Sequence, residues 1–389
     1  MAEAVPTPDT LAIYVHWPFC RSLCPYCDFN SHVSEQVDHA RWRAAFVSEL
    51  DHYAEIAGPR RITSIFFGGG TPSLMAPETA AAVIDAIADR FTLDAHIEIT
   101  LEANPTSTEA TRLAAFADAG VNRVSLGVQA LDDEALKFLG RTHSAADTLS
   151  AIQLAAETFQ RYSFDLIYAR PGQSVIQWQD ELAQAIALSR GHLSLYQLTI
   201  EQGTPFFMAQ ARGDLDMPDE GVSAALFETT QDMMTAAGIP AYEISNHAAP
   251  GQECRHNMAY WHYRDYIGIG PGAHGRITAD GNIHATRQHR APEIWLRRVE
   301  GRGHATQTDE PLDTQSVIAE LAVMGLRITD GITANNFRAR AGVTLDEVIE
   351  PAVVKRLQEA ELIVYDSAGL RATPAGLQRL DAVIAALFA

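Results

Sequence analysis

Residues 11–32 read LAIYVHWPFCRSLCPYCDFNSH, a short apolar run followed at once by three cysteines. The run LAIYVHW (11–17) is typical of a buried strand, because β-branched and aromatic residues predominate in it. Cys20, Cys24 and Cys27 then follow within eight residues, on the loop that leaves this strand. The whole chain has only four cysteines, too few for a disulfide scaffold, so the cluster predicts a metal centre.

The alternation of strand and helix continues to about residue 246. Further strands are predicted at 62–68, 96–104, 121–129, 162–169 and 192–200, with a weaker one at 241–246. Between them, apolar residues three and four apart predict helices at 41–57, 77–91, 108–120 and 221–238. This order predicts parallel βαβ units in an α/β fold, forming a full or partial (β/α) TIM-like barrel. Functional groups are then expected at the carboxyl ends of the strands.

Three segments are predicted along the chain. Residues 1–246 form the barrel, and residues 247–309 form a linker region without a strong period that contains HNMAYW. Residues 310–389 contain helical stretches, a two-stranded wing in LIVYDSAGLRAT (362–373) and a last helix, which predicts a winged-helix-like α+β domain. Seven basic against eleven acidic residues in this last segment favour a structural or lid role over DNA binding.

The composition is that of a globular protein with a strong acidic excess. The 389 residues include 49 acidic and 29 basic side chains, for a formal net charge of −20. Nucleic-acid binding draws on clustered Lys and Arg, so we expect no nucleic-acid partner. The first residues, MAEAVPTPDT, have neither a basic region nor an apolar core, and no apolar run reaches membrane-spanning length. We therefore expect a cytoplasmic protein.

Two kinds of metal centre are compatible with the cysteine spacing. Three thiolates can bind three irons of a [4Fe–4S] cube and leave the fourth iron open to an external ligand. The alternative is a structural zinc site, with His16 or His32 as the fourth ligand. Cys254 lies far away in the sequence and is interpreted as a small core residue.

Other predicted strand ends also carry groups that can bind a polar ligand. GGGTP (68–72) lets exposed backbone groups approach a ligand closely, and a tight turn is the less favoured alternative. A cationic partner such as an α-ammonium would offset the desolvation of Glu102. Gln129 and Asp165 suit a ribose. Arg141 can pair with a carboxylate, or form a surface salt bridge or cap.

Together these features resemble the radical S-adenosylmethionine (SAM) superfamily. The resemblance implies a radical SAM barrel, a [4Fe–4S] cluster, and SAM chelated to the open iron through its amino and carboxylate groups. Electron transfer into the sulfonium would cleave a C–S bond and yield a 5′-deoxyadenosyl radical. It also implies that the GGGTP loop meets the amino group of the methionine.

The resemblance extends to the oxygen-independent coproporphyrinogen III dehydrogenase group. It is carried by IYVHWPFC…CPYC, GGGTPS, SLGVQ, DLIY and the C-terminal domain, over nearly the whole chain. The match implies that Tyr14 lies against the cluster-bound SAM and Tyr26 against a second ligand. The SAM-binding residues that it implies are Tyr14, Tyr26, Gly69, Gly70, Thr71, Glu102, Gln129, Arg141 and Asp165. No catalytic residue is assigned.

Two departures favour a sister branch, the HemW-type haem chaperones. The dehydrogenase has a further cysteine two residues after the third, where this chain has Phe29. It also has a long extension before the tyrosine, whereas thirteen residues precede Tyr14 here. This chain also has Arg170 in YARPGQ, where relatives more often have Gly-Leu. The effect of this difference on SAM binding is open.

The HemW-like proteins also carry an HNxxYW motif, present here as HNMAYW (256–261). The resemblance implies haem binding by His256, Asn257, Tyr260 and Trp261, since imidazole binds haem iron and aromatic rings stack on porphyrin. From the residues alone, the favoured interpretation gives Tyr260 and Trp261 packing roles and His256 a hydrogen-bonded structural role. The glycine-rich YIGIGPGAHGR follows and can bring backbone close to the same ligand.

The resemblance therefore implies a haem chaperone that holds a [4Fe–4S] cluster, SAM and haem. Its partners would be apo-haemoproteins such as respiratory enzymes, and an electron donor of the reduced flavodoxin or ferredoxin type. Any association with a membrane would come through the recipients. The alternative function is radical oxidative decarboxylation of coproporphyrinogen III to protoporphyrinogen IX. A radical SAM enzyme acting on tRNA is disfavoured by the acidic charge.

Overall fold

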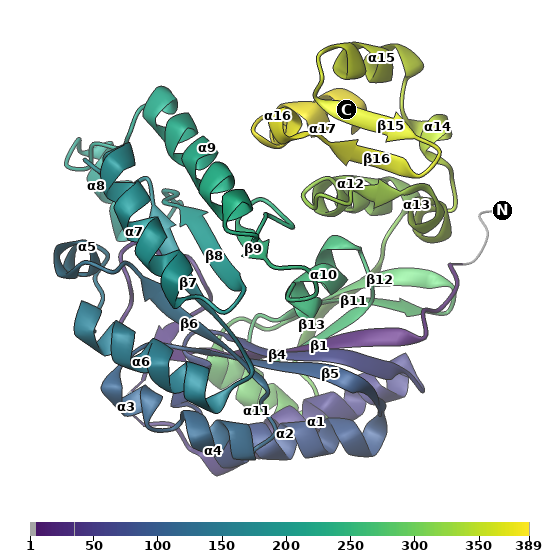
Figure 1. Ribbon diagram of the computed structural model, residues 1–389. Coiled ribbons are helices and arrows are strands. Elements are labelled where there is room, and N and C mark those ends of the chain that lie inside the picture. The colour runs from purple at the N-terminus through teal and green to yellow at the C-terminus, as the bar shows by residue number, and fades with distance from the viewer. Residues whose placement is uncertain (1–4, 35, 389) are drawn as a thin grey trace.

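A computed structural model describes residues 5–34 and 36–388. Its main feature is one curved sheet of eleven strands, ordered β13-β12-β11-β10-β1-β4-β5-β6-β7-β8-β9 (Figure 1). The six central strands β1 and β4–β8 run parallel, which confirms the predicted βαβ order. They are β1 (Thr10–Trp17), β4 (Arg61–Gly69), β5 (Thr92–Ala103), β6 (Arg123–Gln129), β7 (Arg161–Tyr168) and β8 (His192–Gln197). The end strands β13 and β9 do not pair within the described residues, so the barrel is partial.

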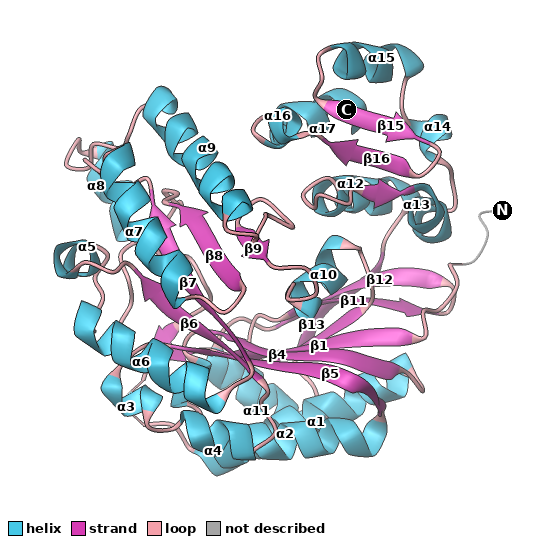
Figure 2. Ribbon diagram, viewed as in Figure 1, coloured by secondary structure: helices cyan, strands magenta, loops and turns pink. Residues whose placement is uncertain are grey.

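Helices cover the outer face of this sheet (Figure 2). They begin with α1 (His39–Ala57) and α2 (Pro77–Arg90), and continue along the chain with α3 (Ser107–Ala110), α4 (Leu113–Asp118), α5 (Asp133–Phe138), α6 (Ala145–Thr158) and α7 (Val175–Leu188). Near β8 lie α8 (Pro205–Ala211) and α9 (Glu220–Ala236). The region 108–120, expected as one helix, is divided between α3 and α4.

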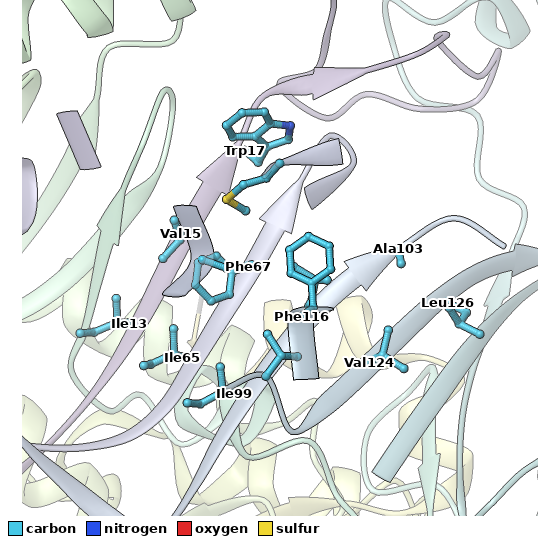
Figure 3. Packing of buried hydrophobic residues seen from close by; sticks show 14 of the residues in the cluster. Ile13, Val15, Trp17, Ile65, Phe67, Ile99, Ala103, Phe116, Val124 and Leu126 are labelled. Carbon is cyan, nitrogen blue, oxygen red and sulfur yellow. The ribbon is translucent and has the colours of Figure 1, made fainter. Parts of the chain in front are cut away.

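The strands present apolar side chains to these helices at every second residue. Figure 3 shows this packing for Ile13 and Val15 on β1, Ile65 and Phe67 on β4, with Phe116 of α4 above them. Phe67 and Phe116 have no exposed surface. Because side chains alternate along a strand, the intervening residues face the inside of the curved sheet. Many of these are polar, which makes the inner face the place for a functional site.

Residues 241–309 differ most from expectation. The weak strand expected at 241–246 is wrong: β9 (Asn246–Ala248) starts at its end and pairs antiparallel with β8. Residues 247–309, expected to be a linker, instead extend the sheet. They form α10 (Arg255–Trp261), β10 (Tyr266–Ile269), β11 (His274–Ala279), β12 (Asn282–Gln288), α11 (Pro292–Arg302) and most of β13 (Thr306–Pro311). β10 pairs parallel with β1, and β11–β13 follow antiparallel.

The C-terminal segment has the predicted winged-helix-like order. It comprises α12 (Thr314–Gly325), β14 (Ile332–Thr333), α13 (Ala334–Ala341), α14 (Leu345–Val348), α15 (Pro351–Glu359), β15 (Ile363–Asp366), β16 (Gly369–Ala372), α16 (Pro374–Leu377) and α17 (Leu380–Phe388). The three strands form a small antiparallel sheet in the order β14-β16-β15. A separate apolar core lies beneath them. No helix in the described part of the chain combines the length and apolarity that crossing a bilayer requires.

A buried ionic cluster joins this segment to the large sheet. Asp265, which has no exposed surface, accepts hydrogen bonds from Arg340 of α13 (2.8 Å) and from Arg60 (3.3 Å). The backbone N–H and hydroxyl of Thr278 on β11 also donate to it, at 2.7 and 2.9 Å. Two guanidinium groups therefore depend on one carboxylate that water does not reach.

We predict that Asp265→Ala lowers the free energy of unfolding by about 3–5 kcal/mol, because it leaves two buried cations without their counter-ion. Urea denaturation of the full chain measures this. The matched control is Asp214→Ala, which removes an ion pair with Arg212 whose side chains are 59% and 60% exposed. We expect that control to change stability by less than about 1 kcal/mol. Equal losses for the two variants would contradict the structural role given to Asp265.

Candidate functional site

A cavity of about 420 Å³ opens at the carboxyl ends of the parallel strands. The three clustered cysteines line it together with the ends of β4–β8. Eight of the nine residues assigned to SAM also line it, all except Tyr14: Tyr26, Gly69, Gly70, Thr71, Glu102, Gln129, Arg141 and Asp165. Residues from five strands and their loops thus meet in one place.

The cysteine loop is fixed at its far end by Asn30. The Asn30 side-chain amide donates to the carbonyls of Pro271 (2.9 Å) and Arg290 (3.0 Å), more than 240 residues away in the chain. Gly272 leaves room for this contact, since a Cβ atom there would lie 2.7 Å from Asn30 Nδ2. The glycine-rich segment after HNMAYW therefore supports the cysteine loop.

His16 is engaged in the same contact and is not free to bind a metal. Its Nε2 lies 2.9 Å from the Asn30 carbonyl, and its Nδ1 lies 3.0 Å from the Tyr14 hydroxyl. A carbonyl only accepts, so Nε2 carries the proton and Nδ1 accepts from Tyr14. His32 also faces Asn30, with its Nε2 3.4 Å from Oδ1. Neither histidine is therefore placed as the fourth ligand of a zinc site.

The three thiols are free and partly buried. Among the residues that the structure describes, no three His, Cys, Asp or Glu side chains converge as ligands of a single metal ion. In a [4Fe–4S] cube each thiolate binds a different iron, so the donors need not converge on one point. Cys20, Cys24 and Cys27 on one cavity wall fit such a group. Cys254 is 1% exposed and faces Glu98 (Sγ to Oε1 3.4 Å), as expected of a buried residue.

The glycine loop at the end of β4 packs too closely against its neighbours to accommodate side chains at Gly69 and Gly70. Gly69 has φ 114°, and a Cβ there would lie 2.6 Å from the His16 ring. A Cβ on Gly70 would lie 2.8 Å from the Phe19 carbonyl oxygen. The loop therefore lies flat against the strand that leads into the cysteines, and its backbone faces the cavity.

Two carboxyl groups lie at the inner end of the cavity. Burial raises the pKa of Glu102 to about 8, with a further contribution from the negative charge of Asp165, against a hydrogen bond from the Gly69 N–H (3.2 Å). Burial likewise raises the pKa of Asp165 to about 6. Within the described part of the chain neither carboxyl forms an ion pair. Two desolvated carboxyls of this kind form a suitable site for a ligand that brings a positive charge.

Arg141 belongs to the cavity wall, not to a surface salt bridge. It donates to the Gly127 carbonyl (2.9 Å), to Cys24 Sγ (3.3 Å) and to Asn104 Oδ1. Its Nε is buried and has no hydrogen-bond partner among the described residues, as a wall completed by a ligand would have. Gln129 adopts a left-handed backbone (φ 73°), which is unusual for a residue other than glycine and directs a strand end into the cavity.

Asn104 is a cavity residue that the sequence analysis did not single out. Its amide contacts both Arg141 and Thr71. It lies in LEANP, the same segment as Glu102, but an isolated asparagine carries no motif signal. Only the alignment of β5 beside β4 and β6 brings it to these partners.

The structure does not bring Tyr14 or the HNMAYW residues to this cavity. His256 is 1% exposed, and its two ring nitrogens lie 2.9 Å from the Ser64 hydroxyl and 2.6 Å from the Tyr260 hydroxyl. Its ring stacks on Phe66 at 5.0 Å, and Tyr14 lies beside them. In this conformation neither nitrogen of His256 is available to an iron.

Helix α10 carries this motif on the inner face of the sheet, opposite α1 and α2 (Figure 2). Its end is covered by the C-terminal segment. The Arg327 guanidinium lies over the Trp261 ring at 4.9 Å and pairs with Glu243 at 2.9 Å. Burial and desolvation lower the pKa of His256 to about 3, so the ring is neutral.

Comparison with protein-family models matches two parts of the chain. Residues 14–185 match the Radical SAM superfamily, and residues 312–379 match the HemN C-terminal domain. Among curated proteins, the heme chaperone HemW of Escherichia coli (strain K12) is 38% identical, over 90% of this chain and 91% of its own. The chain belongs to the HemW family of the radical SAM superfamily.

The comparisons also find a mitochondrial relative and a solved structure. "Radical S-adenosyl methionine domain-containing protein 1, mitochondrial" of Bos taurus is 41% identical, over 98% of this chain and 88% of the relative. Coproporphyrinogen III oxidase (HemN) from Escherichia coli has a TM-score of 0.80 at 20% identity, covering 99% of this chain and 91% of the other. This last likeness shows a shared fold. Membership of the superfamily implies a [4Fe–4S] cluster and SAM.

We predict that SAM affinity of the cluster-loaded HemW-family chain rises with pH below about pH 8. Glu102 is mostly protonated there, because burial raises its pKa to about 8. An amino group that chelates the iron is neutral but keeps N–H donors, and the ionised carboxylate accepts from them better than the protonated one. Binding therefore releases the carboxyl proton, which strengthens binding by up to about tenfold per pH unit. Calorimetry at about pH 6.5 and 7.5 measures this dependence. Glu102→Gln is expected to bind more weakly and to show a smaller slope, since only the proton that the amino group of SAM loses on chelation remains. An unchanged slope in that variant would contradict the assignment.

Proposed function

We propose that this protein is a haem chaperone that holds a [4Fe–4S] cluster and SAM, binds haem and delivers it to apo-haemoproteins such as respiratory enzymes. Cys20, Cys24 and Cys27 would hold the cluster. The GGGTP loop and Glu102 would hold the methionine part of SAM, while Gln129, Arg141 and Asp165 would lie near its nucleoside. Bound SAM would either be the source of a radical or serve as a structural ligand of the cluster. Curated relatives named heme chaperone support this function.

The residue at position 29 favours the chaperone function over that of the coproporphyrinogen III dehydrogenase. The dehydrogenase motif has a further cysteine where this chain has Phe29, whose side chain is 63% exposed at the cavity. The one remaining thiol, Cys254, is buried at the start of α10 and bonded to Glu98. The cysteine loop therefore offers three thiols and an apolar rim, to which Leu23 (59% exposed) also contributes. Exposed apolar side chains beside a cavity are typical of a binding surface.

The partners follow from the same proposal. Reduction of the cluster calls for an electron donor of the reduced flavodoxin or ferredoxin type. The net charge of −20 supports the view that nucleic acid is not a partner. We place the protein in the cytoplasm, with any membrane association arising from its recipients. The names of the animal relatives place those proteins in mitochondria.

We propose that haem binds at the HNMAYW motif through His256, Asn257, Tyr260 and Trp261. In the structure His256 is bonded to Ser64 and Tyr260, so haem ligation there requires α10 to move away from β4 and from Arg327. Such movement would let the imidazole exchange one hydrogen bond for iron. A binding site at the Phe29 rim would need no such movement.

Anaerobic haem titration of the cluster-loaded protein separates these two sites. We expect His256→Ala and Trp261→Ala to weaken haem binding at least about tenfold, or 1.4 kcal/mol. Phe29→Ser should leave the affinity unchanged, as should the control Val323→Ser, which alters a 51% exposed residue of α12. Weakening by Phe29→Ser alone would place haem at the rim and contradict the motif assignment.

The same protein preparation tests the alternative function. Incubated anaerobically with coproporphyrinogen III, SAM and a reductant, it is expected to form no protoporphyrinogen IX. Substantial product would favour the dehydrogenase. Transfer of bound haem to an apo-haemoprotein, followed by the gain of the recipient's absorbance, tests the delivery step.

A further inference from the structure

Two of the three clustered cysteines are joined by a continuous series of hydrogen bonds through the cavity wall. Arg141 NH1 lies 3.3 Å from Cys24 Sγ, and its NH2 contacts Asn104 Oδ1. Asn104 Nδ2 lies 3.1 Å from Thr71 Oγ1, which lies 3.4 Å from Cys20 Sγ. The series therefore runs from Cys24 through Arg141, Asn104 and Thr71 to Cys20.

The direction of every hydrogen bond in this series is fixed by Arg141. A guanidinium only donates, so the atom of Asn104 that faces it must be the carbonyl oxygen. The Asn104 NH2 group then faces Thr71 and donates to its hydroxyl oxygen. A hydroxyl has a single proton, which Thr71 can therefore direct to Cys20 Sγ. Both ends of the series thus present donors to sulfur.

The surrounding backbone holds these groups in place. Thr71 is 5% exposed, and its N–H donates to the Phe19 carbonyl (2.9 Å), one residue before Cys20. The Gly127 carbonyl accepts a hydrogen bond from Arg141 NH2 (2.9 Å), which holds the guanidinium against β6. Ser31 also lies within reach of Cys20, and Tyr26 within reach of Cys24, so these hydroxyls are the competing donors.

We propose that Asn104 is a positioning residue that directs Thr71 and Arg141 onto the cluster thiolates, and thereby raises the reduction potential of the iron–sulfur cluster. Hydrogen bonds to cluster sulfurs stabilise the added negative charge of the reduced state. The inference depends on the cluster that the superfamily implies and is independent of where, or whether, haem binds. Its failure is distinguishable from failure of the chaperone proposal.

The test is an anaerobic redox titration of the cluster, followed by electron paramagnetic resonance (EPR) in the absence of SAM. We expect Thr71→Val, which removes the donor at constant shape, to shift the reduction equilibrium toward the oxidised state by up to about tenfold, or about 59 mV for one electron. Thr71→Ser retains the hydroxyl and should behave as wild type. Ser31→Ala, the control for the competing donor, should shift the equilibrium less than Thr71→Val.

A double-mutant cycle isolates the role of Asn104. In Asn104→Asp both side-chain oxygens accept, so the Thr71 hydroxyl turns from Cys20 to the new carboxylate. The added charge itself also lowers the potential, but it does so whether or not Thr71 is present. We therefore expect Asn104→Asp to shift the potential more in the wild-type background than in Thr71→Val.

Equal shifts of Asn104→Asp in the two backgrounds, or a Thr71→Val potential equal to wild type, would overturn the proposal. Loss of the cluster from folded Thr71→Val but not from Thr71→Ser would support it, since only the hydroxyl differs in kind. Loss from both variants would show that the shape of residue 71 matters, not its donor, and would overturn it. A wild-type protein without a four-iron signal would refute the cluster itself, whatever the result of the haem titration.

Discussion

The anchoring of the cysteine loop across the carboxyl ends of a parallel sheet is the constraint on which the site depends. A loop that carries three thiols close together in sequence has many conformations of its own. Asn30 restricts them by binding the backbone at Pro271, which follows β10, and at Arg290, which follows β12. His16 on the first strand binds the carbonyl of the same asparagine. Residues from the beginning and the end of the large domain therefore both bind Asn30 and fix the cysteine loop.

The inner face of the sheet gives this loop its chemical surroundings. Outward-facing apolar residues form the core, so the polar residues of the same strands gather inside. Glu102 and Asp165 are desolvated there, and Arg141 and Thr71 face the cysteine sulfurs. Away from the cavity, helix α10 with the HNMAYW motif lies between the inner face of the sheet and the C-terminal segment (Figure 1), whose Arg327 contacts Trp261. The cavity at the carboxyl ends of the strands is therefore open to ligands, whereas His256 of the motif proposed to bind haem is buried.

Much of the fold could be predicted from local patterns. The six parallel strands are apolar enough on alternate residues to be recognised, and the helices between them have a clear period. The strands β11–β13 escaped detection because they form antiparallel hairpins with polar residues; β13 reads TQTDEP. The helix α13, with the sequence ANNFRARA, has too few apolar residues to reveal its period.

The functional site likewise combines residues that local sequence patterns predict with residues that only the fold brings together. Cysteine spacing and the glycine loop are local signals, and both lie at the cavity as predicted. Asn104 gains its role only when the sheet register places it between Arg141 and Thr71. The burial of His256 depends on Ser64, nearly two hundred residues earlier, and no local pattern can show that a helix will fold against it.

The central claim is that three thiolates hold a [4Fe–4S] cluster with one iron open to SAM. The most direct measurement is metal analysis and EPR of the anaerobically reconstituted, reduced protein, recorded with and without SAM. We expect about four irons and four sulfides per chain, and a cluster spectrum that changes when SAM is added. Stoichiometric zinc, or a cluster spectrum indifferent to SAM, would contradict it.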